Sequence, residues 1–448
     1  MLSLSESSSL LRERKISSVE LTRQCLANIE RFNPTLNAFI TVTAELALAQ
    51  AQQADKELAN GNWRGPLHGV PVAIKDLIDV AGVPTTAASL QLRARVASED
   101  ADIVTRLKRE GAVIVGKTNL HEFAFGGSGM VSAYGPARNP WDTSRITGGS
   151  SSGSAAAVAA GMCVAALGTD TAGSIRIPAA LCGIVGHRPS DGVWNLQGVI
   201  PLRKSFDTVG PITRTVEDAA LMFQALVTAH DIAPLSADLK HLSVGVARSG
   251  FWDGLDAGVA TSIEHAIGVF RSFAESVADL ELKVGVKWTN FDAEILDYHH
   301  TMLAESPQLY QPGTLERLRA CTAISKGALD DAIAGLAAAR QQTTRIFEEV
   351  DLILTPTTVV PAPEISVLYA MSSVDLRAYE VKNLLRNTAP FSLLFWPSIS
   401  VPCGFTNNGL PIGLQISGRP GADTLVLQVA RAYEQATAWH KRTPPVFA

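Results

Sequence analysis

The stretch GGSSSGS at residues 148–154 opens directly onto an apolar segment, which ends at a second run of small residues, GTDTAGS at 168–174. Glycine and serine tolerate the unusual backbone dihedrals that are needed where a backbone comes close to a reacting carbonyl group. Upstream, the segment GVPVAIKD at 69–76 is an apolar, strand-like run that ends on a single amine, that of Lys75. Serine hydroxyls together with a buried lysine indicate acyl transfer.

The composition is that of a large globular protein. Its 448 residues are 46% hydrophobic and 18% charged, which supplies a large core and is far from a disordered composition. The formal net charge is −5, and no block of lysine or arginine is present. We therefore expect no nucleic-acid partner and no contact with an anionic membrane surface.

The five cysteines are odd in number, widely separated and without CxxC spacing, so the sequence supports neither disulfides nor a zinc site. The segment 1–15 lacks the apolar run of a secretory signal. The longest apolar run, 155–167, is too short for a membrane span of ~20 residues. These features predict a cytoplasmic protein without a metal or another cofactor.

Short β-branched runs alternate with helical patterns along the chain. Residues 70–74 and 112–115 are predicted strands, and the segment 102–110 between them has helical spacing. The alternation returns later, with a helix expected at 256–277 and a strand at 282–288. This order predicts an α/β fold, a single-domain α/β/α sandwich with a central mixed, mostly parallel twisted sheet covered on both faces.

We expect one domain that spans residues 1–448, because no repeat and no Gly/Ser linker divides the chain. The parts of this domain differ in the secondary structure and the role that we expect for them. In chain order they are a helical N-terminal preface at 1–62, a catalytic core at 65–235, a variable, largely helical substrate-pocket region at 236–395, and C-terminal strands with a helix at 396–448.

Three familiar patterns are rejected on their context. Residues 111–118 match the Walker A letters, but their centre is an apolar β-branched run instead of a flexible phosphate loop. Residues 149–153 match G-x-S-x-G, but the preceding segment 139–145 has loop chemistry where a nucleophile elbow needs a strand. The candidate histidines stand alone, without the partners of a catalytic triad or a metal site: His68, His121 and His187.

The small-residue stretches at 148–154 and 168–182, with Lys75 in its GVPVAIKD segment, resemble the amidase signature family. The similarity extends to GKTN at 116–119, SFDTVGP at 205–211, VPCG at 401–404 and GLQ at 413–415, and it is weakest from about 235 to 350.

This resemblance implies a catalytic triad of lysine, cis-serine and serine. Ser150 precedes Ser174 by 24 positions and Lys75 precedes it by 99, as the family's triad requires. In that mechanism Ser174 attacks the carbonyl, and Ser150 passes the proton to Lys75 and later returns it to the leaving amine. Burial at the end of an apolar strand would lower the pKa of Lys75 enough to leave the amine neutral.

The turn before the helix that begins near Ile175 directs consecutive backbone N–H groups toward the carbonyl oxygen, as in an oxyanion hole. Its candidate donors are the N–H groups of Thr171, Ala172, Gly173 and Ser174, with Ala172 where many relatives carry glycine. Three further residues are candidates for a supporting role: Ser152 and Asp170 as orienting groups, and Arg176 as a structural group or a contact to a substrate carboxylate.

The main functional prediction is a stand-alone serine amidohydrolase that cleaves a carboxamide C–N bond through an acyl-enzyme, with carbamate, urethane or ester bonds as further options. Its expected partner is a small-molecule amide or carbamate, and its expected state is a monomer or homodimer. An apolar pocket favours aryl or hydrophobic substrates. The candidate pocket residues are Phe125, Gly126, Gly127, Ser128, Gly129, Met130, Phe395 and Trp396.

The alternative prediction is the A subunit of a glutamyl-tRNA amidotransferase, a glutaminase and transamidation enzyme that works inside a complex. It ranks second because the segment 388–396 is apolar where glutamine would need charged partners, and burying glutamine's charges without partners is costly. A catalytically inactive scaffold is disfavoured because Lys75, Ser150 and Ser174 are all present.

Overall fold

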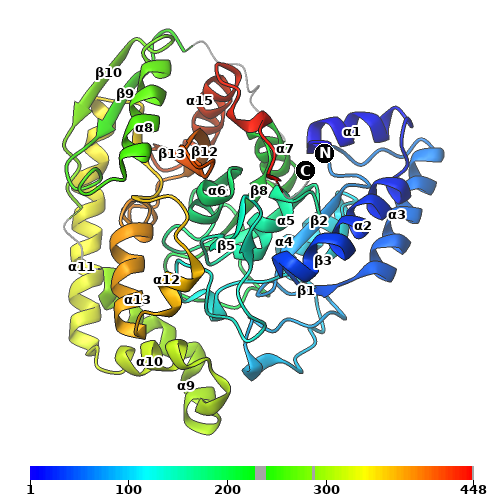
Figure 1. The fold of residues 1–448 in the computed structure, drawn as a ribbon, viewed down its shortest axis with the longest axis horizontal. Coiled ribbons are helices and arrows are strands. Elements are labelled where there is room, and N and C mark those ends of the chain that lie inside the picture. The colour runs from blue at the N-terminus through cyan, green and yellow to red at the C-terminus, as the bar shows by residue number, and fades with distance from the viewer. Residues whose placement is uncertain (228–238, 285–287, 446–448) are drawn as a thin grey trace.

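A continuous 11-stranded sheet forms the centre of the molecule, and helices lie against it (Figure 1). The computed structural model describes residues 1–227, 239–284 and 288–445. Within these ranges the strand order is β1-β3-β2-β6-β8-β7-β12-β13-β11-β9-β10. The bounds are β1 (Phe39–Val42), β2 (Pro71–Lys75), β3 (Val113–Thr118), β6 (Ala165–Asp170), β7 (Val185–Arg188), β8 (Thr208–Thr213), β9 (Ser243–Ala247), β10 (Ser276–Leu280), β11 (Leu352–Pro356), β12 (Ser398–Phe405) and β13 (Pro411–Gly418), with a separate pair β4 (Arg138–Asn139) and β5 (Asp142–Ile146).

The helices begin with recognisable caps in several places. Both α1 and α2 carry a capping box, in which Ser3 pairs with Glu6 and Ser17 with Glu20. None of the helices in the described ranges has the length and apolar character of a membrane span, and the cytoplasmic location stays a prediction. The bounds are α1 (Leu4–Arg12), α2 (Ser18–Leu36), α3 (Ala44–Ala59), α4 (Asp102–Arg109), α5 (Ser152–Ala159), α6 (Arg176–Cys182), α7 (Val216–Leu226), α8 (Ala257–Phe270), α9 (Leu296–Glu305), α10 (Pro312–Cys321), α11 (Lys326–Thr343), α12 (Ile365–Tyr369), α13 (Ser373–Glu380), α14 (Ala389–Leu393) and α15 (Asp423–Gln435).

Successive residues of the central strands enter different cores, which is why both faces of the sheet are covered. In β2, Val72 and Ile74 belong to one hydrophobic cluster and Ala73 to another. In β3, Ile114 joins the first cluster, whereas its neighbour Val115 joins the second. Side chains that alternate between two buried faces require a helical layer on each side. The predicted α/β/α sandwich is therefore confirmed.

Parallel pairing is confined to two blocks of the mixed sheet, β3-β2-β6 and β11-β9-β10. The remaining pairs, including β6 with β8 and β12 with β13, are antiparallel. The region 236–395 contributes β9, β10 and β11 to the sheet as well as helices. Helices α9, α10, α12 and α13 of this region lie together beside the sheet (Figure 1).

Two strands differ from the sequence prediction. β1 lies in the preface that was expected to be helical, and it pairs with the edge of β3. The strand expected at 282–288 is found earlier, as β10, while residues 285–287 lie outside the described residues. β10 is an exposed edge strand without a buried residue, so it lacks the alternating apolar pattern that would reveal it.

Candidate active site

Three strands bring the candidate residues to one edge of the sheet. β2 and β6 are parallel neighbours, so Lys75 at the end of β2 and Asp170 at the end of β6 face the same edge. β8 runs antiparallel to β6, and Asp170 lies opposite Thr208, the first residue of β8. The segment that precedes β8 therefore also reaches this edge, although it is distant in sequence.

Lys75 is a fully buried amine bound to two hydroxyl groups. Its Nζ lies 2.7 Å from Ser150 Oγ and 2.8 Å from Thr169 Oγ1. Burial lowers the pKa of Lys75 to about 7, against the opposing fields of the Asp170 and Asp207 carboxylates. A lysine with this pKa is partly neutral near neutral pH and can accept a proton from a hydroxyl group.

Backbone hydrogen bonds fix the segment of Ser150 and join it to Ser174. The peptide bond between Gly149 and Ser150 is cis. The N–H of Ser151 donates to the carbonyl oxygen of Ser174 at 3.1 Å, and the N–H of His121 donates to the carbonyl oxygen of Ser150 at 3.1 Å. Ser174 is only 4% exposed, and its side chain borders a small cavity. The three residues singled out in the sequence thus meet at one place.

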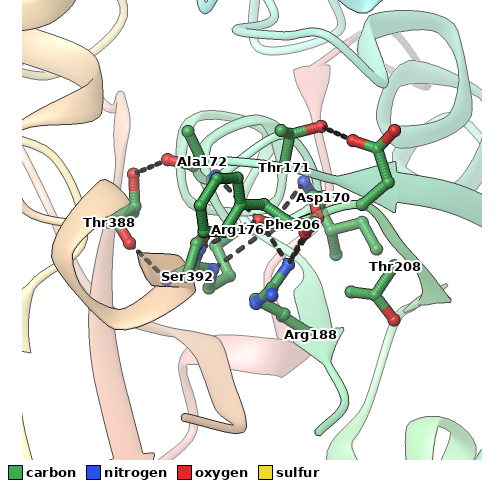
Figure 2. Close-up of polar contacts among 12 residues, drawn as sticks. Asp170, Thr171, Ala172, Arg176, Arg188, Phe206, Thr208, Thr388 and Ser392 are labelled. Carbon is green, nitrogen blue, oxygen red and sulfur yellow. Dashed lines mark hydrogen bonds and ion pairs between the residues drawn. The ribbon is translucent and has the colours of Figure 1, made fainter. Parts of the chain in front are cut away.

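Asp170 organises the turn that carries Ser174, and its contact with Arg176 can be followed in Figure 2. Its carboxylate accepts the Gly173 N–H at 2.7 Å and the Ile175 N–H at 3.2 Å, and two nitrogens of Arg176 approach it at 3.0 and 2.9 Å. Burial alone would raise the pKa of Asp170, but the charges of Arg176 and Arg188 and these hydrogen bonds hold it well below its usual range. The carboxylate therefore stays ionised and fixes the turn.

The same contacts bear on the expected oxyanion donors. Because the Gly173 N–H already donates to Asp170, three donors remain candidates, and they belong to Thr171, Ala172 and Ser174. Gly173 has φ of +131°, and a Cβ there would collide with the hydroxyl of Thr388. Position 173 therefore needs glycine, both because of its positive φ and because a side chain would meet Thr388. The N–H of Gly173 stabilises the turn through its hydrogen bond to Asp170.

The two other candidates for a supporting role occupy different surroundings. Ser152 lies at the start of α5, and its hydroxyl is 3.4 Å from the carbonyl oxygen of Asn119. Arg176 is fully buried, and besides Asp170 it donates to the Thr388 carbonyl oxygen at 3.0 Å, to Gln415 at 2.7 Å and to Ser392 at 2.7 Å. Figure 2 shows Arg176 directed into this network of protein oxygens.

The cavity beside Ser174 is lined by apolar side chains and two arginines. Phe125 and Gly126 were expected there, whereas Arg203 and Arg377 were not. Arg203 lies just before the SFDTVGP similarity, which was the available signal, but Arg377 lies on α13 without any motif. The lining residues are Ala124, Phe125, Gly126, Thr171, Ala172, Ser174, Leu202, Arg203, Arg377 and Leu385.

The other predicted pocket residues lie outside this lining. The Ser128 hydroxyl donates to Glu380 at 2.6 Å, and Met130 packs in a cluster beside the cavity. A Cβ on Gly127 would touch Leu385, while one on Gly129 would meet the backbone of Gly148. Of these residues, Gly127 lies directly behind the lining residue Leu385.

Phe395 and Trp396 also lie outside the lining of the cavity. Trp396 is 0% exposed and packs with Phe391 and Phe347. Phe395 lies under the guanidinium of Arg340, whose centre is 3.2 Å from the ring centroid. The segment 388–396 is therefore apolar because much of it is core, and none of its residues lines this cavity.

The geometry described above defines a buried serine-lysine site at the edge of an α/β sheet, and the sequence model of the family Amidase matches residues 20–427. The chain belongs to this amidase family of enzymes that act on amides. A relative from Geobacter metallireducens, named as the A subunit of a glutamyl-tRNA(Gln) amidotransferase, is 40% identical, with 96% of each chain covered.

Solved structures agree with the family assignment. A crystal structure of an amidase is 33% identical with a TM-score of 0.88, covering 97% of this chain and 99% of that one. The A subunit of the glutamyl-tRNA(Gln) amidotransferase from Thermotoga maritima is 31% identical with a TM-score of 0.80, covering 98% and 95%.

These comparisons correct two predictions. Curated relatives at 36% to 40% identity over nearly the whole chain share the name of this amidotransferase component. The main prediction of a stand-alone hydrolase for hydrophobic amides or carbamates is therefore wrong, as is the prediction of a small-molecule partner without nucleic acid. The physical premise also failed, because the apolar segment 388–396 does not line the cavity, whereas Arg203 and Arg377 do.

Proposed function

We propose that this chain is the A subunit of a glutamyl-tRNA(Gln) amidotransferase, where it hydrolyses the side-chain amide of glutamine and supplies ammonia. The observation that carries the proposal is the buried Lys75–Ser150 hydrogen bond of 2.7 Å beside the cavity that Ser174 borders. The nearly full-length similarity to proteins of that name supports the choice of substrate and partners.

In the proposed mechanism, Ser174 Oγ attacks the amide carbon of glutamine. Its proton passes to Ser150, and the Ser150 proton passes to neutral Lys75, which becomes an ammonium while the carbonyl oxygen takes up the negative charge. Collapse of the tetrahedral intermediate breaks the C–N bond and returns the proton to the leaving nitrogen. The products of this step are ammonia and an ester of Ser174, which water then hydrolyses to release glutamate.

The negative charge on the carbonyl oxygen needs donors that are already in place. We assign this role to backbone N–H groups in the turn 171–174, with the Gly173 N–H excluded because it is bound to Asp170. Losing one such donor in comparable sites costs ~3–4 kcal/mol of transition-state stabilisation. Asp170 and Arg176 act indirectly, because they hold the turn and do not touch the substrate.

The test measures both halves of the proposed activity. The purified chain is assayed for ammonia release from glutamine, alone and with the partner subunits of a glutamyl-tRNA(Gln) amidotransferase. The complex is then assayed for conversion of glutamyl-tRNA(Gln) to glutaminyl-tRNA(Gln), with Ser174→Ala in the same complex as the control. Conversion that requires Ser174 supports the proposal. A complete set of subunits that neither releases ammonia from glutamine nor converts the tRNA would overturn it.

A further inference from the structure

We propose that Thr388 and Asp207 are positioning residues for the reaction at Ser174. Each holds one part of the turn 171–174, and together they direct the backbone N–H groups of that turn toward the carbonyl oxygen of the substrate. Both roles rest on the proposed function, in which Ser174 attacks an amide. They extend it, because stabilisation of the oxyanion then depends on two residues that lie outside the triad and outside the turn.

Thr388 fixes the orientation of one peptide group of the turn. Its buried hydroxyl donates to the carbonyl oxygen of Ala172 at 2.6 Å, and Figure 2 shows the two residues joined by this contact. The N–H of the same peptide group belongs to Gly173 and donates to Asp170 at 2.7 Å. A peptide group is planar, so partners at both its oxygen and its nitrogen fix its orientation. The Ala172 oxygen is therefore kept from turning toward the oxyanion, which it would repel.

Asp207 fixes the beginning of the turn from another part of the chain. The hydroxyl of Thr171 donates to one oxygen of the Asp207 carboxylate. The other oxygen accepts the backbone N–H groups of Leu202 and Arg203, at 2.8 and 3.0 Å. Thr171 is 4% exposed and lines the cavity. Its side chain is thus tied to the segment that precedes β8, which restrains the peptide groups on both sides of Thr171.

The end of the turn is held by partners on the adjacent helices. The carbonyl oxygen of Ser174 accepts the N–H of Ser151 at 3.1 Å, and that of Gly173 accepts the N–H of Ile177 at 2.8 Å. Ser151 directly precedes α5, and Ile177 lies on α6. The bond from Ile177 sets the direction of the Ser174 N–H, because that N–H and the Gly173 oxygen belong to one peptide group. For the first half of the turn, the long-range restraint comes from the two proposed positioning residues.

Misdirected N–H groups are expected to lower the rate more than the affinity for substrate. Removal of one oxyanion donor in comparable sites lowers kcat by about 10²- to 10³-fold. A displaced donor retains part of its effect, so we expect the loss of either hydrogen bond to lower kcat by about 10- to 100-fold. The neutral carbonyl oxygen of the bound substrate depends much less on these donors than the oxyanion does. KM should therefore change by less than about threefold.

Threonine variants test each hydrogen bond with little change in volume. Thr388→Val and Thr171→Val replace the hydroxyl by a methyl group, whereas Thr388→Ser and Thr171→Ser keep the hydroxyl. We expect the fall in kcat in the valine variants, and a kcat within about threefold of the parent value in the serine variants. Thr213→Val is the matched control and should leave kcat unchanged. Thr213 is 0% exposed, and at the opposite end of β8 its hydroxyl donates to the Thr215 carbonyl oxygen at 2.9 Å. Ammonia release from glutamine by the complex is the measurement.

A small alkyl fluorophosphonate reports on the turn without any amide substrate. Ser174 Oγ forms a bond to phosphorus, fluoride leaves, and the released proton passes through the relay to Lys75. The phosphoryl oxygen takes the position of the carbonyl oxygen and gains negative charge in the transition state, so it needs the same N–H donors. Intact mass spectrometry of the full chain follows the reaction. Phosphonylation should be about tenfold or more slower in both valine variants and unchanged in the control.

The outcomes separate the positioning roles from the proposed function. Unchanged kcat in Thr388→Val would overturn the role of Thr388, and unchanged kcat in Thr171→Val would overturn that of Asp207. Serine variants as slow as the valine variants, a raised KM at parental kcat, or phosphonylation of the valine variants at the parental rate would overturn both roles, as would a parent chain that the probe does not label at Ser174. If a valine variant does not fold, the alanine variant at the same position replaces it, with the same expectation.

The probe also gives a result if glutamine is not the substrate. If Ser174 is labelled, and both valine variants react slowly while the complex fails to use glutamine or to convert the tRNA, the positioning roles stand and the amidotransferase proposal fails.

Discussion

Two groups of arginines lie close to Ser174, and they differ in their burial and in what surrounds them. Arg176 is fully buried, and the carboxylate of Asp170, two side-chain oxygens and one backbone oxygen accept its hydrogen bonds. Arg203 and Arg377 share one carboxylate and border the cavity. The first group is fully buried within the protein, whereas the second group lies at the wall of the cavity. Arginine near an active site is thus informative only when its partners are known.

The two groups also differ in how far apart their residues lie in the sequence. Arg176 and Asp170 lie six positions apart and are joined by the turn that carries Ser174. Arg203, Asp292 and Arg377 come from three separate segments of the chain. We therefore expect the first group to control the geometry of the Ser174 turn, which lies between its members in the sequence.

The largest effect is expected from Ser174→Ala, which removes the attacking group without touching either arginine group. Turnover of glutamine should fall on the order of 10⁴-fold or more, as for other serine nucleophiles. The free energy of unfolding should stay within about 0.5 kcal/mol of the parent value, because only a hydroxyl oxygen is lost. Steady-state kinetics and urea unfolding check both statements. Amide hydrolysis within tenfold of the parent would show that another group is the nucleophile.

The second prediction compares the two arginine groups directly. Arg176→Met leaves the buried Asp170 without its main counter-charge and should lower the free energy of unfolding by about 3–5 kcal/mol. Arg377→Met removes a partly exposed cation and should cost about 1 kcal/mol or less, while raising KM. Denaturant unfolding of both variants provides the comparison. Equal destabilisation would mean that both groups are structural.

The third prediction concerns the pH dependence of the rate. Lys75 must be neutral to accept a proton, and its pKa is lowered to about 7 by burial. Below that pH the neutral fraction falls tenfold per unit, so kcat/KM should rise with pH up to about 7 and then level off. Lys75→Met should lose most of the activity over the whole range. A flat profile, together with an active Lys75→Met, would remove the lysine from the mechanism.

Most of the strands and helices that could be predicted were indicated by local sequence features. The strand ending at Lys75 and the buried helix after Ser151 follow from apolar runs bounded by small residues, and the family resemblance supplied the grouping of Lys75, Ser150 and Ser174. The polar edge strand β10 gave no such pattern because it has no buried face. Arg203 and Arg377 could not be paired from the sequence, since only the fold brings Asp292 between them.

The smallest effect is expected at Trp396, which the sequence placed in the substrate pocket. In the structure its ring packs with Phe347, at a centroid distance of 4.6 Å, and with Phe391, away from the lining of the cavity. Trp396→Phe should therefore change KM by less than about twofold, with a destabilisation of the order of 1–3 kcal/mol from the lost volume. Phe125→Leu is the matched variant, because Phe125 does line the cavity and its loss should change KM for every amide. If instead Trp396→Phe alters KM as strongly as Phe125→Leu, the substrate extends beyond the cavity into the apolar core around Trp396.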